Sequence, residues 1–344
     1  MRIRDYGITV GELPTGKLNK ISDVDGVTVG HSTVINERHN TGVTVVMPCK
    51  DNMFAKKLPC ASFVLNGFGK TAGLVQIDEL GTLESPIALT NTLNVGMVHH
   101  AVTEYMIKRC KEDNVPIYSF NPIVCECNDA SLNDIQDRAV MPVHVYEAIE
   151  NACADFEEGA VGCGRGMTCH GLKGGVGSAS RIIEIGKNKY TFGVLVQSNH
   201  GRLADLTVNG KNIGKDIAER IEENKLDKGS CIVILATDAP VSDRQLKRII
   251  KRCSVGLARL GSFIGHGSGE VFIGFSTANR YPDIREKSDV LSYEMISENK
   301  IDLCFRAAAE CTEEAILNSL AAAEKVSGYS GKVRLPLSDF SDLI

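Results

Sequence analysis

Ser230 lies at the junction between a charged, helix-like segment that stops at Gly229 and an apolar strand that begins at Cys231. A small hydroxyl residue at the mouth of a buried strand has two interpretations. It could form a turn, or it could present its hydroxyl as a nucleophile at the tip of the strand. A serine hydroxyl is a weak nucleophile at neutral pH and needs a nearby base. The second interpretation therefore requires a base and assisting polar groups elsewhere in the chain.

A hydroxyl and a carboxylate follow in the segment GHGSGEVFIGF, residues 265–275. Ser268 and Glu270 share one face of an expected strand, because strand side chains repeat every second residue, and they could form a hydrogen-bonded pair. The G-x-S-x-G frame of a nucleophile elbow fails here, because residue 266 is a histidine and a strand follows the serine. The pair is therefore either part of an active site or a polar entrance to a strand.

Asn199 ends an expected strand over residues 191–199. Its amide could donate to an oxyanion or could cap a turn. The next residue, His200, is predicted to be a surface or core histidine and not a catalytic base. Before this strand, the segment MTCHGLKGGVGSASR contains Gly174 and Gly175. Such a loop either lets the backbone approach a ligand closely or forms a flexible β-turn.

Two further patterns are weak. Cys169 precedes His170, but no pair of C-x-x-C knuckles accompanies them, so no metal site is predicted. Gly69-Lys70-Thr71 follows a strand as in a phosphate-binding loop, but Val64 stands where that motif needs its first glycine. A turn with an exposed lysine is predicted there instead.

Composition limits the class of protein. The chain has 344 residues with 43% apolar and 24% charged side chains, as in soluble globular proteins. A net charge of −5 without a basic stripe argues against nucleic-acid binding. No run approaches the roughly 18 apolar residues of a membrane span, and the N-terminal residues lack a signal peptide's apolar core. We therefore expect a cytoplasmic protein that interacts with neither membranes nor nucleic acids, with its twelve cysteines reduced and mostly buried.

The elements that must position these residues are short strands and amphipathic helices. β-Branched runs flanked by Gly, Asn or Pro predict strands over residues 26–34, 42–48, 61–67, 191–199, 231–238 and 270–277. Apolar spacing predicts helices over residues 216–225, 242–261 and 303–328. Ser242 and Gln245 have the spacing of a capping box at the start of the second helix. Strands as uniformly apolar as CIVILA have no wet face, so layered α/β packing with a sheet covered on both sides is expected.

Seven segments, in this order, together resemble one family: RDYGITVGELPTGKLNKISDVDGVTVGHSTV, SPIALTNTLNVG, NDASLNDI, KGGVGSASR, VQSNHGR, GSCIVILATDAP and GSGEVFIGFSTANR. They are similar to the DmpA/BapA-type aminopeptidases, which comprise L-aminopeptidase/D-amidase-esterases and β-peptidyl aminopeptidases. The resemblance covers nearly the whole chain. It implies a single-domain, four-layer α/β/β/α sandwich that resembles the N-terminal-nucleophile hydrolases.

The resemblance also implies self-processing. The precursor would cut itself between Gly229 and Ser230, giving an α chain of residues 1–229 and a β chain of residues 230–344. Ser230 would become both the new N-terminus and the nucleophile. An α-amino group has a pKa of about 7.7–8, so the freed amine could act as the base. The cut would thus expose the nucleophile and create its base.

Supporting residues carry over by position. Ser268 and Glu270 would hold the hydroxyl and amine of Ser230, and Glu270 could also bind a substrate ammonium. Asn199 would be the oxyanion donor. Asn128 occupies the place of a tyrosine found in some members, which concerns the substrate range, and we group it with Gly174 and Gly175 as expected substrate-binding residues.

The expected function is that of a serine aminopeptidase or amidase acting on peptides or amino-acid amides. No cofactor or metal is expected, and the family implies a homo-oligomer of αβ heterodimers. Two alternatives stay open. One is a small-molecule amidase, esterase or lactamase on the same fold, and the other is a non-catalytic scaffold that retains the fold.

Overall fold

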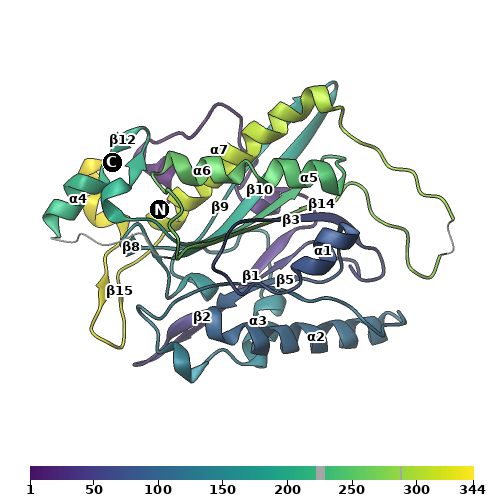
Figure 1. The fold of residues 1–344 in the computed structure, drawn as a ribbon, viewed down its shortest axis with the longest axis horizontal. Coiled ribbons are helices and arrows are strands. Elements are labelled where there is room, and N and C mark those ends of the chain that lie inside the picture. The colour runs from purple at the N-terminus through teal and green to yellow at the C-terminus, as the bar shows by residue number, and fades with distance from the viewer. Residues whose placement is uncertain (222–228, 287–288) are drawn as a thin grey trace.

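The computed structural model describes residues 1–221, 229–286 and 289–344, and it arranges them in four layers (Figure 1). Two β-sheets stack in the middle, and helices cover the outer face of each. This architecture confirms the four-layer α/β/β/α sandwich. The end of the helix expected over residues 216–225 lies outside the described residues.

The smaller sheet has four strands in the order β1 (Thr28–Ile35), β2 (Asn40–Met47), β5 (Ile87–Asn91) and β6 (Ile123–Cys127). The larger sheet has six, in the order β4 (Thr82–Leu83), β3 (Leu58–Gly67), β14 (Gly269–Ser276), β13 (Ser230–Thr237), β10 (Asn188–Asn199) and β9 (Gly175–Ile185). Three short hairpins complete the strands: β7 (Thr168–Cys169) with β8 (Leu172–Lys173), β11 (Thr207–Val208) with β12 (Lys211–Asn212), and β15 (Val326–Ser327) with β16 (Val333–Arg334). All six predicted strands are confirmed.

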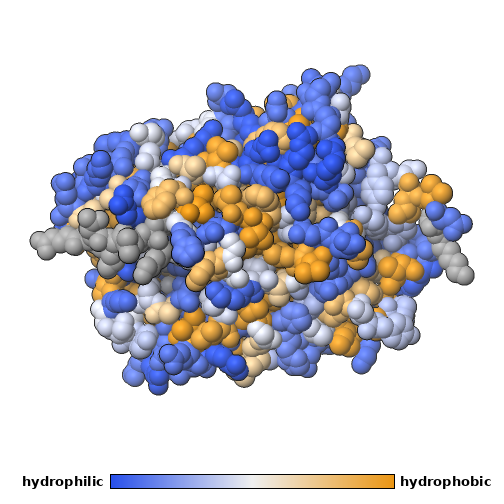
Figure 2. All heavy atoms as spheres, viewed as in Figure 1, coloured by the Kyte–Doolittle hydropathy of each residue, from blue (hydrophilic) through white to orange (hydrophobic). Residues whose placement is uncertain are grey.

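Helices form the two outer layers. The smaller sheet is covered by α2 (Val95–Glu112) and α3 (Pro142–Glu150), and the larger sheet by α5 (Asp243–Ile250) and α7 (Ile301–Ala321) (Figure 1). In the same outer layer, α6 (Cys253–Arg259) packs against α7. Two short helices, α1 (Leu74–Leu80) and α4 (Gly214–Arg220), lie beside these layers. In the face seen in Figure 2, hydrophilic residues dominate the upper helices and apolar residues gather across the middle.

Strand β13 shows why the larger sheet is buried on both faces. Alternate side chains of a strand point to opposite faces, and here both sets are fully buried. The core between the two sheets receives Ile232, Ile234 and Ala236. The core beneath the helices receives Cys231, Val233 and Leu235. The prediction of a sheet covered on both sides is confirmed, and β13 is held rigidly in the middle of the molecule.

The helix expected over residues 242–261 is two helices, α5 and α6, so that prediction is wrong in its extent. The capping box is confirmed, because the Ser242 side chain accepts from the Gln245 backbone and the Gln245 side chain accepts from the Ser242 backbone, both at 3.2 Å. The apolar residues of α5 pack on the larger sheet, whereas those of α6 pack on helix α7. Gly256 lies so close to α7 that a Cβ there would meet the Glu313 backbone nitrogen at 2.7 Å. The chain must reorient between these two packing surfaces, which ends one helix and starts the next.

Most of the cysteines are buried in the way small apolar residues are. None forms a disulfide, and all except Cys153 are buried. Among the residues that the structure describes, no helix has the length and apolar composition needed to cross a membrane.

Candidate active site

Strand pairing brings the predicted site residues together around Ser230, the first residue of β13. Asn199, the last residue of β10, pairs with Ser230 on one side. On the other side Ser230 pairs with Gly269 of β14, in the parallel register. Gly269 lies between Ser268 and Glu270, so three distant segments converge at one end of the sheet. The hydroxyl, the amide and the hydroxyl–carboxylate pair predicted from sequence are therefore neighbours.

Gly229 occupies a position that only glycine fits. Its φ is +147°, and a Cβ there would lie 1.7 Å from the carbonyl oxygen of Asn199. The carbonyl oxygen of Gly229 accepts a hydrogen bond from the Gly269 backbone nitrogen at 3.1 Å. The carbonyl group that precedes Ser230 is thus held by a backbone N–H group, which is the arrangement that stabilises charge on a carbonyl oxygen.

Ser268 and Glu270 form the hydrogen-bonded pair anticipated from their spacing. The Ser268 hydroxyl donates to Oε1 of Glu270, and both side chains are buried. The Asn66 side chain donates to the Ser268 carbonyl oxygen at 2.6 Å and fixes the turn that leads into β14. A register shift between Glu270 and Val271 interrupts the pairing with β3. Such bulges re-aim side chains near active sites.

The Asn199 amide is oriented by two hydrogen bonds. Its Oδ1 accepts from the Thr168 backbone nitrogen at 2.8 Å, and its Nδ2 donates to the Asn128 carbonyl oxygen at 3.0 Å. An amide nitrogen carries two hydrogens, so Nδ2 can donate a second bond to a substrate oxygen. Asn128 is exposed, and its own Oδ1 accepts from the Ala130 backbone nitrogen at 3.0 Å.

A cavity of about 700 Å³ opens at this end of the sheet. Its wall includes Asn128, Asn199, Gly229 and Ser230. Ser268 and Glu270 are not part of that wall. Gly267, the residue before Ser268, is part of it. This volume suits a small-molecule ligand.

Gly174 and Gly175 do not reach the cavity. A Cβ on Gly174 would meet the Ser198 carbonyl oxygen at 2.5 Å, and one on Gly175 would meet the Gly159 carbonyl oxygen at 2.0 Å. Their close backbone contacts serve packing between strands. The cavity wall therefore gives no support to the substrate-binding role expected for these two glycines.

Glu126 is a site residue that sequence reasoning missed. It lies on β6 of the other sheet, is 3% exposed and lines the cavity. One carboxylate oxygen accepts from the Lys70 backbone nitrogen at 2.9 Å, and the other accepts from the Thr92 hydroxyl. The available signal was a single acidic residue within the apolar run IVCEC. Lys70 itself is exposed, as predicted, and lies in an irregular segment that follows β3.

Two neighbours of the site are neutral. Burial raises the pKa of the Cys127 thiol well above its usual value, and this thiol contacts the Ser230 side chain. Burial, followed by the charge of His170, lowers the pKa of His200 to about 3. His200 is buried, which agrees with a core histidine.

Comparison with known proteins agrees with this geometry. The model of peptidase family S58 matches residues 19–334. Beta-peptidyl aminopeptidase BapA of Sphingosinicella microcystinivorans is 37% identical, over 100% of this chain and 91% of that protein.

Two solved structures also superpose over 100% of this chain. The PH0078 protein of Pyrococcus horikoshii OT3 is 44% identical over 98% of its chain, with a TM-score of 0.94. The L-aminopeptidase D-Ala-esterase/amidase of Ochrobactrum anthropi is 33% identical over 99% of its chain, with a TM-score of 0.91, and is described as a variant of the Ntn hydrolase fold. The chain is therefore a member of peptidase family S58, the serine aminopeptidases of DmpA/BapA type with an Ntn-hydrolase fold.

Proposed function

We propose that this protein is a serine aminopeptidase that activates itself by cutting the Gly229–Ser230 bond and then uses Ser230 as its nucleophile. One observation carries the proposal. The register of β13 sets Ser230 between the Asn199 amide and the Ser268–Glu270 pair, at the wall of a cavity.

Self-cleavage would begin with attack of the Ser230 hydroxyl oxygen on the Gly229 carbonyl carbon. The oxygen that develops negative charge is the one already bonded to the Gly269 backbone nitrogen. Breaking the C–N bond transfers the hydroxyl proton to the leaving nitrogen and gives an ester with a free α-amino group. Water then hydrolyses the ester. The products are an α chain of residues 1–229 and a β chain of residues 230–344.

In the mature enzyme the freed amine of Ser230 acts as the base, since its ordinary pKa of about 7.7–8 is close to working pH. It takes the hydroxyl proton while the oxygen attacks the carbonyl carbon of the substrate's N-terminal residue. Asn199 donates to the oxyanion, a contribution of roughly 3–4 kcal/mol to transition-state stabilisation. The amine then protonates the leaving group, and water releases the acyl group. Ser268 and Glu270 hold the hydroxyl and the amine in place.

Selection for a free N-terminus is assigned to Glu126. Its buried carboxylate, at the cavity wall, offers a charge-assisted hydrogen bond to a substrate ammonium. Asn128 lies on the same wall and would contact the substrate side chain. The substrate class is therefore short peptides and amino-acid amides with a free amino group.

A related activity on amino-acid esters and small amides is the second candidate. One solved relative is named as an esterase and amidase as well as an aminopeptidase, and the same acyl-enzyme chemistry would serve these substrates. We also propose that the αβ pairs associate further, since large apolar side chains such as Val75 and Tyr118 are almost fully exposed. Light scattering after gel filtration tests that association.

The intact mass of the purified protein under denaturing conditions tests the central proposal. The wild type should give two chains separated between Gly229 and Ser230, and Ser230→Ala should give one folded chain without activity. Cleavage of the Ser230→Ala protein would show that another protease makes the cut. An uncut wild type that still hydrolyses peptides would remove the need for the freed amine.

A further inference from the structure

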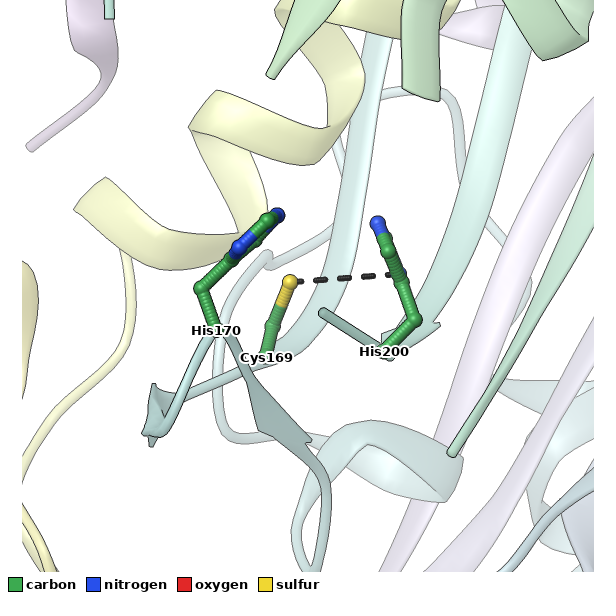
Figure 3. Close-up of side chains that lie close together, drawn as sticks. All are labelled: Cys169, His170 and His200. Atoms are coloured by element: carbon green, nitrogen blue, oxygen red, sulfur yellow. Dashed lines mark hydrogen bonds between the residues drawn. The ribbon is translucent and has the colours of Figure 1, made fainter. Parts of the chain in front are cut away.

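A second cluster of reactive side chains lies behind the cavity wall. Cys169, His170 and His200 each direct a donor atom toward the others, and these atoms all lie within 4.8 Å of one another (Figure 3). All three residues are buried. The Cys169 sulfur is 3.9 Å from Nδ1 of His200, and the two imidazole rings meet edge to face with centroids 5.4 Å apart.

The backbone of His170 is strained in this position. His170 lies in the turn between β7 and β8 with φ +46°, a left-handed conformation that is uncommon for residues other than glycine. Its backbone nitrogen donates to the His200 carbonyl oxygen at 2.6 Å. Gly201 admits the ring, because a Cβ there would lie 2.5 Å from it. Strained positions of this kind gather at functional sites.

We propose that Cys169, His170 and His200 bind one Zn²⁺ ion. One thiolate and two neutral imidazoles are ligands that zinc prefers, at about 2.3 Å for sulfur and about 2.0–2.1 Å for nitrogen. Tetrahedral geometry with those bond lengths separates the donor atoms by roughly 3.3–3.6 Å, so closure by about 1 Å would complete the site. Zn²⁺ replaces the proton of the Cys169 thiol, and a water molecule or backbone carbonyl group takes the fourth position.

The surroundings of His170 fit a metal ligand. Its Nδ1 lies 3.1 Å from the Arg202 carbonyl oxygen. With the proton on Nδ1 donated to that carbonyl group, Nε2 becomes the donor atom toward the metal. Histidine ligands of metals are commonly oriented in this way, by a hydrogen bond from the other ring nitrogen.

The proposed ion would fix the oxyanion amide from behind. His200 directly follows Asn199, and Cys169 directly follows Thr168, whose backbone nitrogen donates to the Asn199 side chain. A metal bound to both segments would tie the β7–β8 hairpin to the end of β10. Thr168 and Asn199 line the cavity, whereas the three ligands are not part of its wall. The ion therefore has a positioning role and takes no part in the acyl transfer at Ser230.

Metal content tests the proposal directly. The wild type, Cys169→Ser and His200→Gln are each equilibrated with buffered Zn²⁺ and freed of unbound metal. Their zinc content is then measured by elemental mass spectrometry. Cys253→Ser is the matched control, since Cys253 is also buried but lies on α6. We expect one equivalent of zinc per chain in the wild type and in the Cys253→Ser control. The zinc content of Cys169→Ser and His200→Gln should be at least tenfold lower. Zinc should raise the melting temperature of the wild type and the control only.

Replacement by Co²⁺ provides a second measurement that does not depend on the folding of any variant. Wild-type protein should develop thiolate-to-cobalt charge-transfer absorption in the near ultraviolet. Less than a tenth of an equivalent of either metal in folded wild type would overturn the proposal, as would equal binding by folded Cys169→Ser. Ser230→Ala protein should bind zinc like the wild type, so this test stands apart from the proposed catalytic role of Ser230.

Discussion

Replacing Gly229 by alanine should slow maturation while sparing turnover. A Cβ at residue 229 would lie 1.7 Å from the Asn199 carbonyl oxygen, and real contacts of this kind are almost never below 3.0 Å. The ends of β10 and β13 must therefore separate by more than about 1 Å. Misplacement of reacting groups by about 1 Å can reduce a rate about 100-fold. The φ of +147° adds about 1–3 kcal/mol of backbone strain for a residue other than glycine.

The expected result is cleavage at least about 100-fold slower than in the wild type. After the cut, residue 229 is the end of a chain and its Cβ can turn away from β10. Activity per cleaved molecule should then lie close to that of the wild type. Intact mass at timed intervals after purification follows the cut, and steady-state kinetics on the cleaved fraction follows turnover.

Gly267→Ala is the matched control. Gly267 lines the same cavity, but nothing lies within 4 Å of a Cβ placed there. It should mature at the wild-type rate. Wild-type maturation of Gly229→Ala, or equal slowing of both variants, would refute the argument from close approach.

Three other perturbations probe the same end of the sheet. Asn199→Asp keeps the acceptor for Thr168 but removes the N–H donor, so kcat of the cleaved fraction should fall about 10²–10³-fold with little change in KM; an unchanged kcat would assign the oxyanion to other donors. Glu126→Gln should lower kcat/KM about 10–100-fold for substrates with a free amino group, and an equal loss on an N-acetylated ester would contradict a role in binding the ammonium. Burial raises the pKa of Asp129 to about 6 from 3.8. The folded state therefore holds this proton more tightly, and the resulting stabilisation, on the order of 3 kcal/mol, is complete below pH 3.8 and is lost as the pH rises through about 6. Asp129→Asn should remove that loss from chemical denaturation curves measured between pH 4 and 7, and parallel curves for the two proteins would show that Asp129 titrates normally.

Local pattern was sufficient for the strands and for the pair at Ser268 and Glu270, because alternation and β-branching act over a few residues. It was insufficient for α2, whose buried face includes small residues such as Ala101 and Cys110. Helix α5 ends early because the chain reorients so that α6 can pack on α7, and this tertiary contact overrides the continuous apolar stripe.

Glu126 and the histidine cluster illustrate the same limit at the site. Glu126 reaches the cavity only because the smaller sheet stacks on the larger one, and no spacing in the sequence reports that stacking. Cys169 and His170 are adjacent in sequence, but His200 joins them only through the pairing of His170 with the end of β10. Such contacts depend on sheet register, which a single sequence leaves open.

The position of β13 and β14 has a consequence for the life of the mature enzyme. These two strands would belong to the β chain, yet they lie in the middle of the larger sheet between β3 and β10 of the α chain. The proposed cut would therefore divide the covalent chain without dividing the fold. Separately made halves would have to open a finished sheet to insert the missing strands. Once unfolded, an enzyme cleaved in this way would have lost the connection that guided its assembly, so its working lifetime would be set by how slowly it unfolds and not by how well it refolds.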